Sequence, residues 1–206
     1  QTASFYVEPD KNYKLKVYYD PEKEQVSYLA RYQLLFEFID LPKDDLNRMY
    51  HDTEYGFPQT NDNELFGRLI LEINQAGLSW TTILKKKENF RKSFDNFNIK
   101  KISKYQEKDI ERLLEDRSII RNKLKINAVI FNAEKVISIQ KEYNSFYNWL
   151  MNHQTNNLSQ WVELFKKKFK FTGGEITKEF LLSIGILSGA HVAHCPVFLS
   201  IKKKII

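Results

Sequence analysis

One acidic residue, Glu72, lies in the middle of an otherwise apolar segment, ELFGRLILEINQAGLSW, which spans residues 64–80. The apolar residues recur at helical spacing and would face a core. Gln75 and Ser79 follow Glu72 by three and seven residues, which predicts a narrow polar stripe with Trp80 one residue beyond. A carboxylate, an amide and a hydroxyl next to an indole indicate the wall of a pocket for a flat, polar, even cationic molecule. A surface glutamate on an amphipathic helix is the alternative interpretation.

The elements that must position this stripe are helices. From residue 44 onward the hydrophobic periodicity predicts an all-α chain, with glycines where the chain must turn. The expected helices cover residues 63–75, 80–96, 107–114, 123–143, 145–152, 158–167 and 177–188.

The first 34 residues have a different character. The stretch FYVEPDKNYKLKVYYDPE alternates aromatic and polar residues around two prolines, which predicts a short hairpin or an extended arm. We therefore expect an N-terminal extension (1–34), a helical domain (35–200) and a basic tail (201–206).

Composition limits the classes of protein that this chain can belong to. It has 206 residues, of which 42% are hydrophobic and 28% are charged, as is typical of a globular protein with one or two domains. No apolar run approaches the roughly 20 residues that span a bilayer, and the first residues have no secretory pattern. A single cysteine, Cys195, excludes an internal disulfide and suits a reducing compartment. We expect an intracellular, cytoplasmic protein that is not associated with a membrane.

The formal net charge of +6 is compatible with a polyanionic partner. Three runs of lysine lie at residues 85–87, 166–168 and 202–204. We expect these side chains to be on solvent-exposed faces of the protein, which is the usual place for such runs. The basic residues near 121–125 are more informative, because they lie at a predicted turn between two helices.

Four blocks of the chain together resemble the DNA-3-methyladenine glycosylase I family, a branch of the helix-hairpin-helix superfamily of DNA glycosylases. The blocks are YHDTEYGFP (50–58), QAGLSWTTILKKKENFRKSF (75–94), LLEDRSIIRNKLKINAVIFNA (113–133) and FKFTGGEITKEFLLSIGILSGAHVAHCP (169–196). The resemblance covers roughly residues 36–195. It implies a helix-hairpin-helix bundle that acts in base excision repair, removing 3-methyladenine from alkylated double-stranded DNA and leaving an abasic site. We expect it to act as a monomer that is associated with the nucleoid.

The resemblance assigns roles in a base pocket. Glu72 matches the carboxylate that hydrogen-bonds the flipped base, Tyr50 and Trp80 match pocket walls, and Phe38 and Gln75 are further base-binding candidates. Because 3-methyladenine in DNA is already cationic, a buried carboxylate could favour its departure without acting as a general base. No lysine is evident at the pocket to form a Schiff base, so a monofunctional glycosylase is expected.

The segment 111–132 resembles the helix-hairpin-helix motif that grips DNA in this superfamily. Backbone N–H groups at the start of a helix form an anion site, and basic side chains add to it. Any basic pair of antiparallel helices would show a similar pattern. Ser118 occupies a position that is usually glycine in relatives. The DNA-binding candidates are Ser118, Ile119, Arg121, Asn122, Lys123 and Lys125.

The resemblance also implies a structural zinc site. His51, His191 and Cys195 match three of the four zinc ligands of the family, and a His and a Cys four residues apart can chelate one ion from one helix face. The position of the fourth ligand, a cysteine in relatives, is Phe36 here. Either water or His194 completes the coordination of zinc, or apolar packing through Phe36 replaces the metal.

Two other functions remain open from the sequence. A non-catalytic DNA-binding or damage-sensing module of the same fold is favoured by the altered N-terminal segment and the missing zinc ligand. A helical protein–protein adaptor that uses residues 1–34 is a more distant alternative. The combination of Glu72, Tyr50 and Trp80 favours the enzyme, because a binding module does not need an acid beside aromatic rings.

Overall fold

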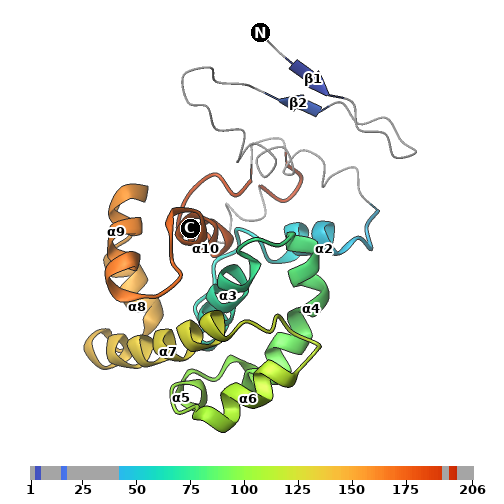
Figure 1. Ribbon diagram of the computed structural model, residues 1–206. Helices are drawn as coiled ribbons and strands as arrows, with labels where there is room; N and C mark the ends of the chain where they lie inside the picture. The colour runs from blue at the N-terminus through green and yellow to red at the C-terminus, as the bar shows by residue number, and fades with distance from the viewer. Residues whose placement is uncertain (1–2, 6–14, 18–41, 192–194, 199–206) are drawn as a thin grey trace.

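The computed structural model describes residues 3–5, 15–17, 42–191 and 195–198, and this part of the chain is mostly helical (Figure 1). Its helices are α2 (Leu46–Thr53), α3 (Asp62–Gln75), α4 (Trp80–Ser93), η1 (Asp95–Phe97), α5 (Ile99–Ile102), α6 (Glu107–Glu115), α7 (Lys123–Tyr143), α8 (Phe146–Asn152), α9 (Leu158–Lys168) and α10 (Gly174–Ser183). The predicted all-α class is confirmed. Two short strands, β1 (Ala3–Phe5) and β2 (Leu15–Val17), pair antiparallel within the N-terminal extension.

Polar side chains define where the helices of the site begin. Asn61 before α3, Ser79 before α4 and Asn122 before α7 each accept a hydrogen bond from a backbone N–H of the first helical turn. Such caps satisfy donors that have no partner inside the helix. Gly77 has a φ of +83°, so it turns the chain between α3 and α4 at little steric cost.

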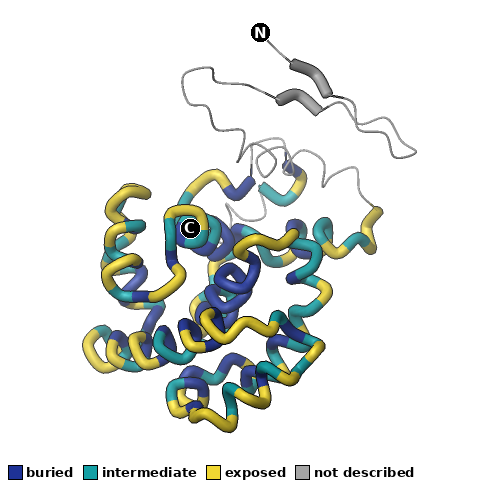
Figure 2. The backbone as a smooth tube through the Cα atoms, in the orientation of Figure 1, coloured by how far each residue is buried: buried dark blue, intermediate teal, exposed yellow. Residues whose placement is uncertain are grey.

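Helix α3 lies at the centre of the molecule and is the element that positions the candidate acid. It contacts α4, α7, α8 and α10, and its tube is almost entirely buried in Figure 2. Gly67, near its middle, is in contact with the ring of Phe97: a Cβ at this position would lie 2.3 Å from the Phe97 ring. Close approach of this ring thus explains a glycine inside a buried helix.

A cluster of buried aromatic rings joins α8, α9 and α10. The rings belong to Phe146, Trp149, Trp161, Phe165, Phe169 and Phe180. The carboxylate of Asp62, in the first turn of α3, accepts hydrogen bonds from the backbone N–H groups of Phe146 at 2.8 Å and Tyr147 at 3.0 Å. An anion at the start of α8 is favourable for the helix dipole, so Asp62 ties α8 to the start of α3.

Two predicted helix ends were wrong. The helix predicted over 80–96 ends at Ser93, because Asp95 and the two residues after it have positive φ. The helix predicted over 177–188 occupies Gly174–Ser183 instead, since Gly185, at φ +74°, turns the chain against the backbone of Gly56. Helices α2 and α5 were not predicted.

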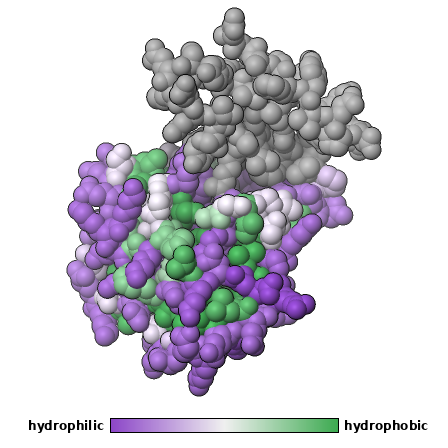
Figure 3. Space-filling view, in the orientation of Figure 1, coloured by the Kyte–Doolittle hydropathy of each residue, from purple (hydrophilic) through white to green (hydrophobic). Residues whose placement is uncertain are grey.

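The outer face of the molecule is predominantly polar. Figure 3 shows hydrophilic side chains around the rim of one face and hydrophobic ones nearer its middle. In the part of the chain that the structure describes, no helix has the length and apolar character to cross a membrane.

Candidate functional site

The carboxylate of Glu72 lies inside the protein. The residue is only 2% exposed and is flanked on α3 by the buried residues Leu71 and Ile73. Its interpretation as a surface glutamate is therefore wrong. Removing a charged carboxylate from water costs several kcal/mol unless nearby groups stabilise the charge, so the surroundings of Glu72 decide what it can do.

The charge of Glu72 raises the pKa of two tyrosines and of one arginine. Burial is the main cause of the raised pKa of Tyr50 and of Tyr55, and in both cases the charge of Glu72 raises the pKa further. Burial works to lower the pKa of Arg68, but the net shift is upward because Tyr50, Glu54 and Glu72 stabilise its positive charge. Glu72 thus lies close enough to all three side chains to act on them electrostatically.

Three aromatic rings lie close to one another in this region. The ring of Tyr50 is 6% exposed, and its centroid lies 5.1 Å from that of Trp80 and 5.9 Å from that of Tyr55. The indole N–H of Trp80 is buried and has no hydrogen-bond acceptor among the described residues. A buried donor of this kind is a group that a bound molecule can use.

The polar stripe is shorter than the sequence indicated. Gln75 is the last residue of α3, is 8% exposed and donates from Nε2 to the carbonyl of Leu78 at 3.3 Å. The extension of the stripe to Ser79 was wrong, because the helix ends at Gln75 and Ser79 is an exposed cap of α4. Phe38 and Phe36 lie outside the described residues.

Arg68 is a site residue that the sequence analysis missed. Its guanidinium donates to the hydroxyl of Tyr50 at 2.7 Å and to the carboxylate of Glu54 at 3.1 Å, and it lies 5.0 Å above the ring of Tyr50. The signal that could have found it is a charged residue inside an apolar run, four residues before Glu72 and so on the same side of the helix.

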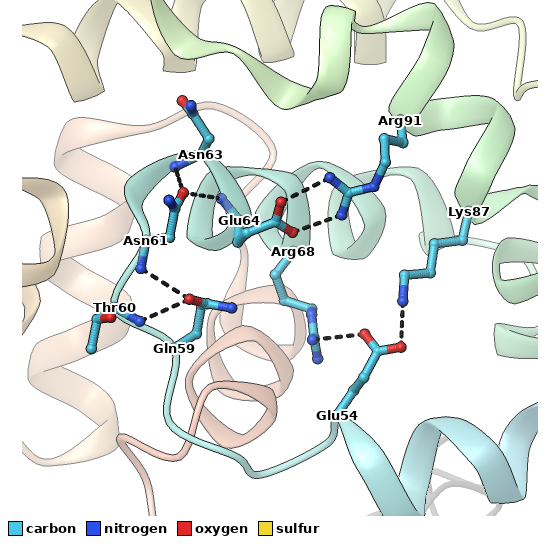
Figure 4. A network of polar contacts seen from close by, with 9 residues as sticks. All are labelled: Glu54, Gln59, Thr60, Asn61, Asn63, Glu64, Arg68, Lys87 and Arg91. Atoms are coloured by element: carbon cyan, nitrogen blue, oxygen red, sulfur yellow. Dashed lines mark hydrogen bonds and ion pairs between the residues drawn. The ribbon is translucent and has the colours of Figure 1, made fainter.

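Ion pairs extend from Arg68 along one side of α3 (Figure 4). Glu54 also pairs with Lys87, and Arg91 donates both N–H groups of its fork to Glu64, at 2.8 and 2.7 Å. These side chains border a cavity of about 270 Å³ whose lining includes Arg68 but not Glu72. The cavity therefore lies beside the aromatic region and not at the acid.

Helices α6 and α7 form a hairpin (residues 107–143) in which the chain turns through residues 116–122. Ser118 donates from its backbone N–H and its hydroxyl to Asp116, at 2.8 and 2.6 Å. Lys86 donates hydrogen bonds to the carbonyls of Arg117 and Ser118, so it links the turn to α4. Ile119 is 3% exposed and anchors the turn in the core.

The remaining candidates of the hairpin separate into two groups. Arg121, Asn122 and Lys123 are exposed at the start of α7, and Lys123 forms a 3.1 Å ion pair with Glu107. Lys125, by contrast, is 7% exposed. The structure brings only the first three residues to the surface.

The position of Lys125 corrects the expectation of a side chain on the surface of the hairpin. Its ammonium donates to the carbonyls of Asn74 at 2.9 Å and Ala76 at 2.8 Å, at the C-terminal end of α3. Burial lowers its pKa. A cation is favourable at the negative end of a helix, so Lys125 caps α3 and joins the start of α7 to the end of the pocket helix.

His51, His191 and Cys195 converge, as the resemblance implied. Their donor atoms lie within 4.8 Å of one another, with Cys195 Sγ at 3.5 Å from His51 Nε2 and 3.2 Å from His191 Nδ1. The other ring nitrogens face Asp52 Oδ1 at 2.8 Å and the carbonyl of Tyr55 at 2.7 Å. Such outer contacts hold an imidazole in the tautomer that binds a metal.

The two separations from Cys195 fit zinc. Tetrahedral Zn²⁺ with bonds of about 2.3 Å to sulfur and 2.0 Å to nitrogen separates the two donors by about 3.5 Å. Both Cys195–His distances are close to that value. Burial lowers the pKa of His191, which favours the neutral form that a metal ligand requires.

Comparison with known proteins identifies the family. The sequence profile of the methyladenine glycosylase family matches residues 41–163. The chain belongs to this family. It is 37% identical over 172 residues to DNA-3-methyladenine glycosylase 1 of Escherichia coli, covering 74% of this chain and 91% of that protein. It is also 31% identical to DNA-3-methyladenine glycosylase of Haemophilus influenzae, covering 71% and 89%.

Solved structures of the family share the fold. A crystal structure of 3-methyladenine DNA glycosylase I (TAG) has a TM-score of 0.69 at 33% identity and covers 76% of this chain and 96% of its own. A TAG structure from Staphylococcus aureus that describes 3-methyladenine recognition has a TM-score of 0.71 at 30% identity, with coverage of 79% and 96%. The boundaries predicted at residues 34 and 200 stay predictions.

Replacing Lys125 by Met should destabilise the fold, because two carbonyls at the end of α3 lose a buried donor. We expect the free energy of unfolding to fall by about 1–3 kcal/mol. Replacing Lys123 by Met removes only an exposed ion pair and should change it by less than about 1 kcal/mol. Urea unfolding of both variants measures the difference, and equal losses would contradict the capping role of Lys125.

Proposed function

We propose that this chain is a monofunctional DNA glycosylase that flips 3-methyladenine out of alkylated double-stranded DNA and removes it by hydrolysis. The observation that carries the proposal is the buried carboxylate of Glu72, whose charge acts on Tyr50, a residue whose ring contacts that of Trp80. Relatives of this family in E. coli and H. influenzae are named for this activity. We also propose that the chain acts as a monomer.

The chemistry needs little from the protein beyond stabilisation of charge. In DNA the N3-methylated base carries a positive charge, so its glycosidic bond is weak. When the C1′–N9 bond breaks, its electron pair moves to the base, which leaves as neutral 3-methyladenine. Water forms the new bond to C1′ and releases a proton to solvent.

Glu72 favours the flipped cation over a neutral base. A carboxylate in a site of low polarity interacts with a cation far more strongly than it would in water. The faces of Tyr50 and Trp80 add cation–π attraction. Ordinary adenine is neutral and lacks the methyl group, so it gains neither interaction. Gln75, and Phe38 outside the described residues, complete the proposed base-binding set.

Replacing Glu72 by Gln should leave the fold intact, because it removes a buried charge and keeps the shape of the side chain. We expect release of 3-methyladenine from methylated duplex DNA to slow by about 10²–10³-fold, the usual effect of losing one preorganised electrostatic group. Single-turnover release of free base measures this.

The matched control is Glu64→Gln. Glu64 is an acid on the same helix, and it pairs with Arg91, which is not part of the proposed base pocket. This control should retain the wild-type rate. A Glu72→Gln variant that releases base as fast as the wild type would refute the assignment of the pocket. Binding of DNA without any release of base by the wild-type chain would favour a damage-sensing module instead.

The α6–α7 hairpin acts as a helix-hairpin-helix grip on the DNA backbone. Backbone N–H groups in the first turn of α7 attract phosphate, and the exposed side chains of Arg121, Asn122 and Lys123 stand beside them. Ser118 and Ile119 shape the turn. These contacts position the duplex and do not read its sequence.

Replacing Arg121 and Lys123 together by Ala should weaken binding to any duplex and flatten its salt dependence. Each phosphate contact contributes about 0.9 to the slope of log K against log salt, so the slope should fall by nearly 2. The control is Lys141→Ala at the other end of α7, which should leave the slope unchanged. Fluorescence anisotropy at several salt concentrations makes the measurement, and an unchanged slope in the double variant excludes this grip.

The cluster of His51, His191 and Cys195 holds a structural zinc ion that ties α2 to the segment after α10. The convergence of three donor atoms and the outer contacts of both imidazoles support this proposal. Water or His194, which lies outside the described residues, supplies the fourth position. The ion would contribute to folding and not to hydrolysis.

Protein purified without chelator should contain about one zinc ion per chain. His191→Ala should lose most of the zinc and melt at a lower temperature, because two ligands hold the metal less tightly than three. His153→Ala, which removes a histidine far from the cluster in sequence, should keep the zinc. Elemental analysis decides the matter: wild-type protein without zinc, or His191→Ala with a full complement, contradicts the proposal.

A further inference from the structure

Arg68 joins the ion pairs on one side of α3 to the aromatic residues near Glu72. One guanidinium nitrogen donates to the hydroxyl of Tyr50 at 2.7 Å, and another donates to Glu54 at 3.1 Å. We propose that Arg68 is a positioning residue that orients the hydroxyl of Tyr50 as a hydrogen-bond donor for the base pocket. The inference rests on the proposed function, because it assigns Tyr50 to that pocket.

The orientation follows from the chemistry of the two groups. Arginine has five N–H donors and no acceptor, whereas a phenol has one hydrogen and an oxygen that can accept. Because the oxygen of Tyr50 accepts from Arg68, the hydrogen of Tyr50 cannot point at Arg68. The hydroxyl is thereby restricted to donating elsewhere.

Burial keeps that hydrogen on Tyr50. It is the main cause of the raised pKa of Tyr50, and the charges of Glu72 and Glu54 act in the same direction, while Arg68 opposes them. Tyr50 is therefore a neutral hydroxyl donor at physiological pH, and not a phenolate.

The guanidinium is itself held on several sides. Glu54, which accepts a hydrogen bond from Arg68, is also paired with Lys87. The guanidinium carbon of Arg68 lies 5.0 Å from the centroid of the Tyr50 ring. Tyr50 also has a second aromatic neighbour: its ring centroid lies 5.1 Å from that of Trp80. A side chain with this many partners has little rotational freedom, so it can fix the group to which it donates.

Arg91 provides a matched comparison in the same network (Figure 4). It pairs with Glu64 through both fork nitrogens and lies 4.9 Å over the ring of Phe97, so it resembles Arg68 in having a carboxylate and an aromatic partner. In the described part of the chain, its hydrogen bonds and its ring contact do not involve Tyr50. Loss of Arg91 thus reproduces the loss of an ion pair without the loss of the tyrosine contact.

The test is a double-mutant cycle between Arg68 and Tyr50. Wild type, Arg68→Met, Tyr50→Phe and the double variant are compared by single-turnover release of 3-methyladenine from methylated duplex DNA. Binding of the free base 3-methyladenine is measured alongside. Arg91→Met is the control, and circular dichroism verifies folding. If Arg68→Met does not fold, Arg68→Lys, which keeps a charge beside Glu54 but lacks the planar fork, takes its place in the cycle.

We expect Arg68→Met to reduce release and base binding by about 10- to 100-fold, the usual cost of a misplaced pocket group. In the Tyr50→Phe background the same change should cost no more than about twofold, because the hydroxyl that it positions is already absent. Arg91→Met should behave as the wild type.

Three results would each overturn the role of Arg68. Arg68→Met could reduce release and binding equally in the wild-type and Tyr50→Phe backgrounds, it could have no effect on them, or Arg91→Met could reduce them as much as Arg68→Met does. A wild-type chain that binds the free base but releases none from DNA overturns the proposed function alone, since the binding cycle still tests Arg68. A chain that neither binds nor releases the base overturns both.

Discussion

A negative charge enclosed by protein, that of Glu72, is the constraint around which this structure is arranged. A carboxylate that is 2% exposed has lost nearly all of its hydration, and water is the best solvent that an anion has. The loss must be offset by nearby positive charge and by polar hydrogens. Arg68 and the hydroxyl-bearing rings of Tyr50 and Tyr55 are the groups on which its charge acts. A cationic base is a further partner of the kind that such a carboxylate favours.

Helix α3 connects this charge to the rest of the molecule at both of its ends. At the N-terminal end Asp62 caps α8, and at the C-terminal end the ammonium of Lys125 binds the carbonyls of Asn74 and Ala76. The α6–α7 hairpin is thereby bonded directly to the helix that carries Glu72. In the proposed function, this link would set the distance between a phosphate at the hairpin and a flipped base near the rings.

The two sides of the pocket region are held by different chemistry. On one side Arg68, Glu54 and Lys87 form ion pairs that are only partly exposed. On the other side Tyr55 contacts both Tyr50 and His191, and the carbonyl of Tyr55 accepts from the His191 ring. The cluster of His51, His191 and Cys195 is therefore in contact with the aromatic region. Anything that orders His191 also restricts Tyr55.

The sequence by itself was sufficient for the fold class, for most helix positions and for the family, because apolar periodicity and local caps such as Asn61 and Ser79 are encoded within a few residues of one another. It also marked Glu72, Tyr50 and Trp80, and it indicated that His191 and Cys195 lie close together. The shared helix face expected for that pair was wrong, because both residues lie in bends after the end of α10.

The tertiary structure alone decided which polar side chains are buried, and against what. Lys123 and Lys125 are two residues apart with the same charge, yet one pairs with Glu107 in solvent and the other is enclosed against α3. The sequence does not show that Arg68 donates a hydrogen bond to the hydroxyl of Tyr50, which lies eighteen positions earlier in the chain. Periodicity shows which face of a helix is covered. Which element covers it, and therefore which charges meet, depends on packing between segments that are distant in sequence.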